Sequence, residues 1–68
     1  MKWGADRMTV EYAVDNRPTD DVIVVTFLNW TEHILYDSRK TPFDIPLGLR
    51  EYPVESMNTA DNLTIIEI

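Results

Sequence analysis

The sequence predicts a mainly β fold of about five short strands in a small barrel or sandwich. Apolar and polar residues alternate in several short segments, β-branched residues dominate the most apolar segment, and polar turns separate the segments. Three prolines between residues 42 and 53 prevent a long helix in that region. The alternative is an α+β fold with one short helix near 30–37 or 55–61.

The first half of the chain contains the clearest strand signals. Residues 9–14 alternate between apolar and more polar side chains, which predicts a half-buried strand. A turn rich in Asp and Pro is expected over 15–21. Residues 22–28 read VIVVTFL and are apolar on both faces. This segment is therefore predicted to be a central strand that is covered on each side.

Residues 29–37 fit either of two structures. As a strand, they form a hairpin with 22–28; as a helix, they bury two adjacent apolar residues. The strand is preferred because helices shorter than ~12 residues are weak in isolation.

The second half of the chain is predicted to be extended. Residues 43–47 alternate in polarity, and 49–54 are expected to form an edge strand because Pro53 donates no backbone hydrogen bond. A polar loop or one helical turn is expected over 55–62. The last predicted strand covers 63–68, which is strongly apolar.

Length and charge restrict the function. The 68 residues suit a single small domain, predicted over 8–68 after an irregular leader at 1–7. Twelve acidic residues oppose six basic ones, and the formal net charge is −6. Such a chain repels polyanions, so direct binding to nucleic acid or to an anionic membrane surface is not expected.

Cysteine usage and hydropathy suggest where the protein resides. The absence of cysteine excludes disulfides, thiol nucleophiles and iron–sulfur clusters. The sequence contains neither the apolar stretch of a signal peptide nor the ~20 apolar residues that cross a bilayer. A soluble, cytoplasmic protein is expected, located in the host cell if its source is viral.

The side chains offer little for catalysis. His33 is the single histidine, and Ser38 or Ser56 would have to meet it without a motif that presents a serine nucleophile. Glu32 and Asp37 do not complete a metal-ligand pattern with His33, and two glycines are too few for a phosphate-binding loop. We therefore predict no catalytic, metal-binding or cofactor-binding residue and expect that the chain is not an enzyme.

The aromatic residues instead indicate a binding surface. Trp30 lies in an expected turn, and exposed aromatic residues rimmed by charge are typical of protein-interface hot spots. The alternative is that these residues simply fill the core. The candidate protein-binding residues are Trp30, Tyr36, Phe43, Tyr52, Asp15, Asp20 and Asp21.

The last strand suggests a second surface. An exposed apolar strand edge pairs readily with another chain, whereas a strand inside its own sheet does not. The candidate oligomer edge consists of Leu63, Ile65, Ile66 and Ile68.

By elimination, the favoured function is a non-catalytic acidic protein-binding module. Such a module includes a small inhibitor that occupies a basic or nucleic-acid-binding site on a larger protein, and virus-encoded inhibitors are often of this kind. The first alternative is a structural or assembly subunit, such as a virion component, that forms homo-oligomers through terminal strands. The second is a nucleic-acid-binding small barrel with basic residues on one face and Trp30 and Tyr36 for stacking, which the net charge disfavours. Its basic candidates are Arg17, Arg39, Lys40 and Arg50.

Overall fold

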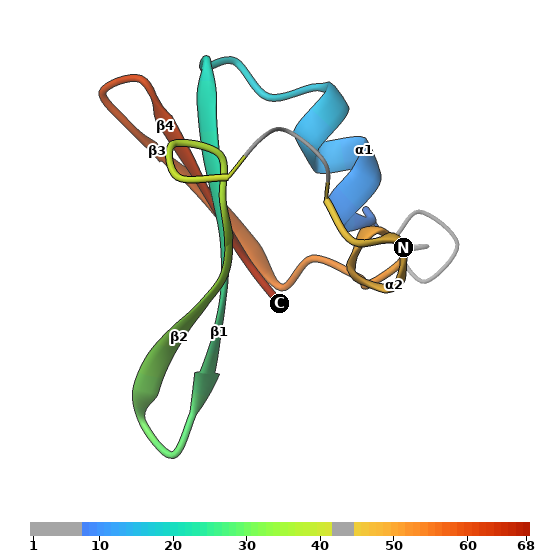
Figure 1. Cartoon of the computed structure of the whole chain (residues 1–68), viewed down its shortest axis with the longest axis vertical. Coiled ribbons are helices and arrows are strands. Elements are labelled where there is room, and N and C mark those ends of the chain that lie inside the picture. The colour runs from blue at the N-terminus through green and yellow to red at the C-terminus, as the bar shows by residue number, and fades with distance from the viewer. Residues whose placement is uncertain (1–7, 42–44) are drawn as a thin grey trace, which may run out of the picture.

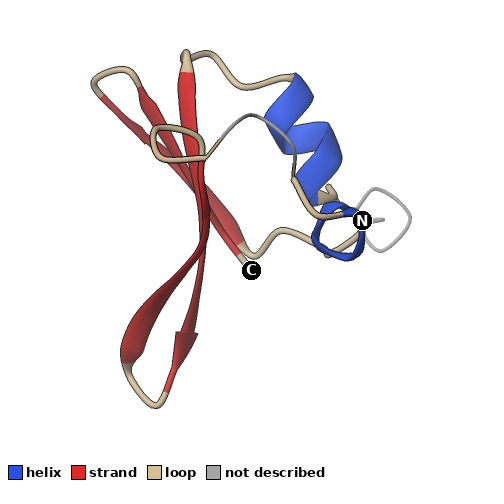
Figure 2. Cartoon of the chain, in the orientation of Figure 1, coloured by secondary structure: helices blue, strands red, loops and turns tan. Residues whose placement is uncertain are grey.

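The computed structural model describes residues 8–41 and 45–68. The fold is mainly β, as predicted: four strands form one open mixed sheet, and two short helices lie on one side of it (Figure 2). The sheet is open, so the predicted barrel or sandwich is wrong. The elements in chain order are α1 (Val10–Asp15), β1 (Asp21–Leu28), β2 (Thr31–Asp37), α2 (Leu47–Arg50), β3 (Ser56–Ala60) and β4 (Leu63–Glu67) (Figure 1).

The strand order is β2-β1-β4-β3. β1 runs antiparallel to β2 and parallel to β4, and β4 runs antiparallel to β3. The prediction that 22–28 forms a central strand is confirmed, and so is the preference for a strand over a helix at 29–37.

The prediction of a strand at 9–14 is wrong, because this segment forms helix α1. Thr9 caps the helix, and its hydroxyl oxygen accepts a hydrogen bond of 3.2 Å from the backbone N–H of Tyr12. Val10, Ala13 and Val14 are buried, which is the i, i+3, i+4 spacing of a helix face. Val10 and Val14 are four positions apart. In a segment of only six residues, this spacing fits both the two-residue period of a strand and the 3.6-residue period of a helix.

Two further predictions in the second half of the chain are wrong. The expected edge strand at 49–54 is replaced by helix α2 and a loop, in which Pro53 makes an isolated β-bridge with Thr9. The expected polar loop or helical turn at 55–62 contains strand β3, whose five residues are all exposed. The predicted extended segment at 43–47 lies partly outside the described residues.

The expected oligomer edge is also corrected. β4 is paired on both sides, with β1 along Asp21–Val25 and with β3 along its whole length, so it is an interior strand. Ile66 is fully buried, and Leu63, Ile65 and Ile68 are half-buried. The edges of the sheet are β2 and β3.

The core lies between the helices and one face of the sheet. Its buried members are Val10, Ala13, Val14, Val22, Val24, Tyr36, Ile45 and Ile66. The strand register places Ile23, Val25 and Ile65 on the opposite face, which we call the open face. Both helices lie on the other side of the sheet (Figure 2), yet Ile23 and Val25 are also buried, so both faces of β1 are buried, as predicted.

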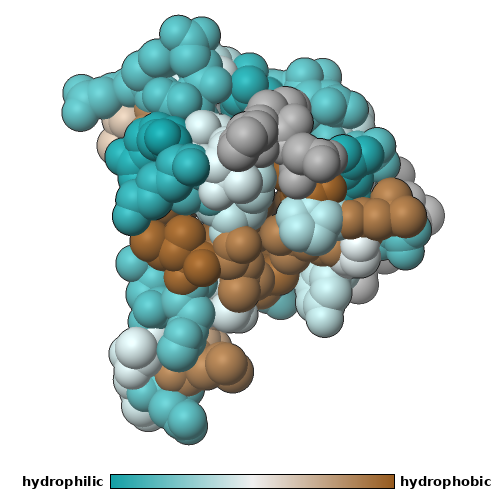
Figure 3. All heavy atoms as spheres, viewed as in Figure 1, coloured by the Kyte–Doolittle hydropathy of each residue, from teal (hydrophilic) through white to brown (hydrophobic). Residues whose placement is uncertain are grey.

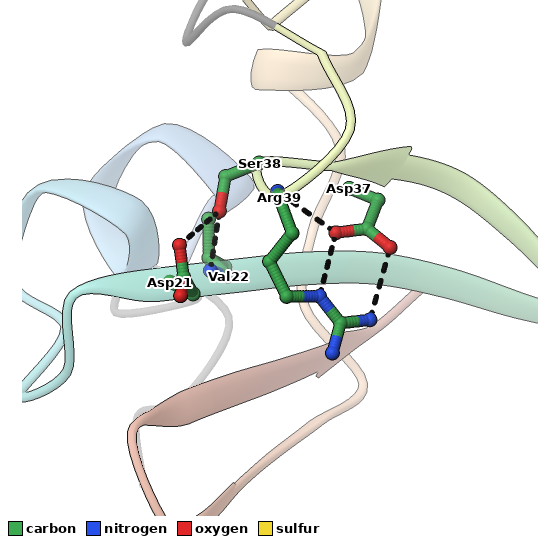
Figure 4. Close-up of polar contacts among 5 residues, drawn as sticks. All are labelled: Asp21, Val22, Asp37, Ser38 and Arg39. Atoms are coloured by element: carbon green, nitrogen blue, oxygen red, sulfur yellow. Dashed lines mark hydrogen bonds and ion pairs between the residues drawn. The ribbon is translucent and has the colours of Figure 1, made fainter.

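An ion pair closes the end of the β1–β2 ladder (Figure 4). The guanidinium of Arg39 donates two hydrogen bonds of 3.0 Å from Nε and Nη2 to the carboxylate of Asp37. The backbone N–H of Arg39 donates a third, also of 3.0 Å. Ser38 Oγ accepts a hydrogen bond of 2.9 Å from the backbone N–H of Val22 and donates one of 3.2 Å to Asp21.

This ion pair predicts a pH dependence of stability. The hydrogen bonds and positive charge of Arg39 hold the pKa of Asp37 at about 2, below its ordinary value of 3.8. The Asp37 carboxylate therefore takes up a proton more readily in the unfolded chain than in the folded protein. The stability that Asp37 contributes is present above pH 3.8 and is lost as the pH falls to about 2.

Urea unfolding at a series of pH values tests this prediction. The unfolding free energy of the Asp37→Asn variant should fall less steeply over that range than that of the unmodified protein. Equal slopes for the two proteins would show that the Asp37–Arg39 pair does not stabilise the fold.

Candidate functional site

The β1–β2 hairpin extends beyond the rest of the sheet (Figure 1). β4 pairs with β1 only as far as Val25, whereas β2 pairs with β1 as far as Leu28 opposite Thr31. Beyond Thr26, the hairpin is therefore a two-stranded ribbon. We call residues 27–34 the hairpin tip.

The hairpin tip exposes apolar side chains on both faces. Alternation along β1 places Phe27 on the open face and Leu28 on the helix-facing side. Ile34 pairs with Val25 and so shares the open face with Phe27. All three side chains are more than half exposed. A two-stranded ribbon buries neither face, so these residues contribute little to the core and leave an apolar surface available to a partner.

Trp30 is the most exposed large side chain at the tip, with a relative exposure of 100%. Asn29 and Trp30 connect the strands, and their φ angles are +53° and +66°. Positive φ at both central residues is the pattern of a type I′ turn, where the second position favours glycine. Tryptophan in this region is strained by roughly 1–2 kcal/mol, and full exposure means that no packing within the described chain offsets the strain.

A recess lies on each side of the ribbon. On the open face it is lined by Phe27, Asn29, Trp30 and Glu67. On the helix-facing side it is lined by Thr26, Leu35, Leu49, Tyr52 and Ile68. Figure 3 shows hydrophobic surface between the hairpin and α2, the region of the second recess.

The structure separates the predicted aromatic residues. Trp30 is fully exposed at the tip, and Tyr52 is 54% exposed in the wall of the helix-facing recess. Tyr36 is a buried member of the core, so its assignment to a binding surface is wrong. Phe43 lies outside the described residues.

The predicted acidic residues lie away from Trp30. Asp20 and Asp21 are at the opposite end of β1, about 23 Å from the tip at ~3.3 Å per residue. The side chain of Asn62 accepts a hydrogen bond of 3.0 Å from the backbone N–H of Asp20 and donates one of 3.0 Å to its carboxylate. Asp15 is exposed at the end of α1. These three acids therefore do not form one site with Trp30.

Two other carboxylates lie near the tip, and sequence analysis missed both. Glu32 pairs with Phe27 across the ribbon, and Glu67 lines the open-face recess. Residues 27–34 contain no Lys or Arg. The hairpin tip therefore combines exposed apolar side chains with negative charge.

Among residues 8–41 and 45–68, no group of three His, Cys, Asp or Glu side chains could hold a metal ion, and no helix is long and apolar enough to cross a membrane. No family model matches the sequence, and neither characterised proteins nor solved structures gave a match.

Proposed function

We propose that the protein is a non-catalytic acidic binding module that docks its hairpin tip into an apolar pocket with a basic rim on a larger protein. The fully exposed Trp30, held at a positive φ, is the observation that carries this proposal. A strained residue with no packing role indicates a function that the fold itself does not require. Tryptophan is also among the residues most enriched in interface hot spots.

The surroundings of Trp30 match the anatomy of an interface. Phe27, Leu28 and Ile34 provide apolar area around it, and Glu32 and Glu67 provide a charged rim. The ribbon projects from the sheet, so it can enter a pocket that the whole protein would not fit (Figure 1). The net charge of −6 would speed association with a basic surface and add specificity.

An inhibitor of a nucleic-acid-binding protein is one form of this function. A pocket rimmed by Lys and Arg is the surface that nucleic acid uses, and the acidic module would compete for it. The alternative function is a subunit that forms homo-oligomers through its terminal strand. The pairing of β4 with a strand on each side argues against that alternative.

A capture experiment tests the proposal. The immobilised full chain is incubated with a lysate of its source organism, beside a Trp30→Ala variant and a Tyr12→Ala control. Tyr12 is an exposed aromatic residue on α1 and lies outside the hairpin. We expect a protein that the unmodified chain and Tyr12→Ala retain, that Trp30→Ala loses, and that high salt releases.

The captured protein counts as a partner only if the purified form shows the same discrimination between the variants. The proposal is contradicted if, at low salt, no protein is retained by Tyr12→Ala and lost by Trp30→Ala.

A further inference from the structure

We propose that the open-face recess between Phe27, Asn29, Trp30 and Glu67 binds an arginine side chain of the partner. This inference rests on the proposed function and specifies which chemical group of a basic partner the module recognises. The four residues come from two strands and a turn, and the strand pairing brings them together.

The register explains why a recess forms there. Glu67 pairs with Val25, and Phe27 lies two residues further along the same face of β1. The described pairing between β4 and β1 ends at Glu67, so no strand lies beside Phe27 on that side. The turn at Asn29 and Trp30 closes the far end. The result is an open recess in the surface, lined by two aromatic side chains, an asparagine and a carboxylate.

The carboxylate of Glu67 is oriented from within the sheet. Ser56 pairs with Glu67 across β3 and β4, and its hydroxyl donates a hydrogen bond of 2.8 Å to Oε1 of Glu67. Within residues 8–41 and 45–68, no cation forms an ion pair with Glu67, and its Oε2 accepts no hydrogen bond. Glu67 therefore retains acceptor capacity for an incoming donor.

An arginine side chain suits a recess that is lined by aromatic side chains and a carboxylate. A guanidinium is planar, stacks on aromatic faces and donates hydrogen bonds in the same plane to a carboxylate. An apolar side chain would desolvate Glu67 without giving it a partner, which is unfavourable. An anionic side chain would be repelled by Glu67.

The test uses the purified full chain and a short peptide with one arginine, acetyl-Gly-Arg-Gly-amide. The same peptide with citrulline is the matched probe, because citrulline keeps the shape of arginine and lacks its charge. Binding is followed by NMR through the indole N–H of Trp30, which a Trp3→Phe variant distinguishes from that of Trp3. We expect saturable shifts with the arginine peptide and none with the citrulline peptide.

Two charge variants test whether the arginine peptide binds at Glu67. Glu67→Gln is expected to weaken arginine-peptide binding about 3- to 5-fold, the size of a partly exposed ion pair. Asp61→Asn removes one charge at the exposed β3–β4 turn, where asparagine tolerates the φ of +56°, and should leave binding unchanged. The dispersion of each NMR spectrum verifies that the variant is folded.

Three results would overturn the proposal: equal binding of the two peptides, no effect of Glu67→Gln, or equal losses in Glu67→Gln and Asp61→Asn. If any of these occurs while Trp30→Ala still abolishes partner capture, the arginine site is wrong and the docking hairpin stands. If Trp30→Ala leaves partner capture intact, the proposed function itself fails.

Discussion

Replacing Ile66 with alanine is expected to lower the free energy of unfolding by about 3 kcal/mol. Ile66 is fully buried in an interior strand and packs in the core between the sheet and the helices. Truncation removes buried apolar surface and leaves a cavity that a strand paired on both sides cannot close. The total stability of a domain of this size is about 3–10 kcal/mol, so the expected loss is roughly a third of it or more.

Ile65→Ala is the matched control for this prediction. Ile65 has the same side chain in the same strand but lies half-buried on the open face. The decrease in unfolding free energy caused by Ile65→Ala should be less than about half of that caused by Ile66→Ala, because less apolar surface returns to water. Urea unfolding measures both values. Equal losses would contradict the placement of the core on the helix-facing side of the sheet.

Replacing Trp30 with alanine is expected to weaken binding to the partner at least ~30-fold, which corresponds to about 2 kcal/mol. The indole is the largest exposed apolar group at the hairpin tip, and its neighbours in the ribbon are less exposed. The stability of the variant should stay within about 0.5 kcal/mol of the unmodified protein, because a fully exposed side chain leaves no cavity.

Titration against the purified partner, with urea unfolding in parallel, measures both quantities. Tyr12→Ala should change the affinity less than about 2-fold, since surface side chains outside a hot spot contribute little. A loss of affinity accompanied by an equal loss of stability would contradict the assignment, because Trp30 would then support the fold.

The parts of the fold that could be predicted are those in which side chains alone determine the structure. β-branched residues dominate β1, and no other element suits them. Helix α1 was missed because six residues are too few to separate a period of 2 from one of 3.6. β3 was missed because its polar residues form a strand only through pairing with β4, a contact that local sequence does not encode.

The candidate site was predictable only at Trp30. A tryptophan next to Asn in a short connection between two strands indicates an exposed turn. The burial of Tyr36 depends on a register shift in which Val24 pairs with Tyr36 and Val25 with Ile34. Glu67 enters the site through the parallel pairing of β4 with β1. Both are tertiary contacts, so the sequence placed Tyr36 on the surface and left Glu67 without a role.

We infer that Trp30 occupies the hairpin tip at the expense of stability, because its φ is strained and its side chain is fully exposed. The most direct test is the unfolding free energy of Trp30→Gly. Glycine relieves the strain at a φ of +66° and loses more backbone entropy on folding, so we expect a net rise of about 0.5–1 kcal/mol. Asn29→Gly is the control and should change little, because asparagine tolerates its φ of +53°. A lower unfolding free energy for Trp30→Gly would show that the indole stabilises the fold and would contradict the claim.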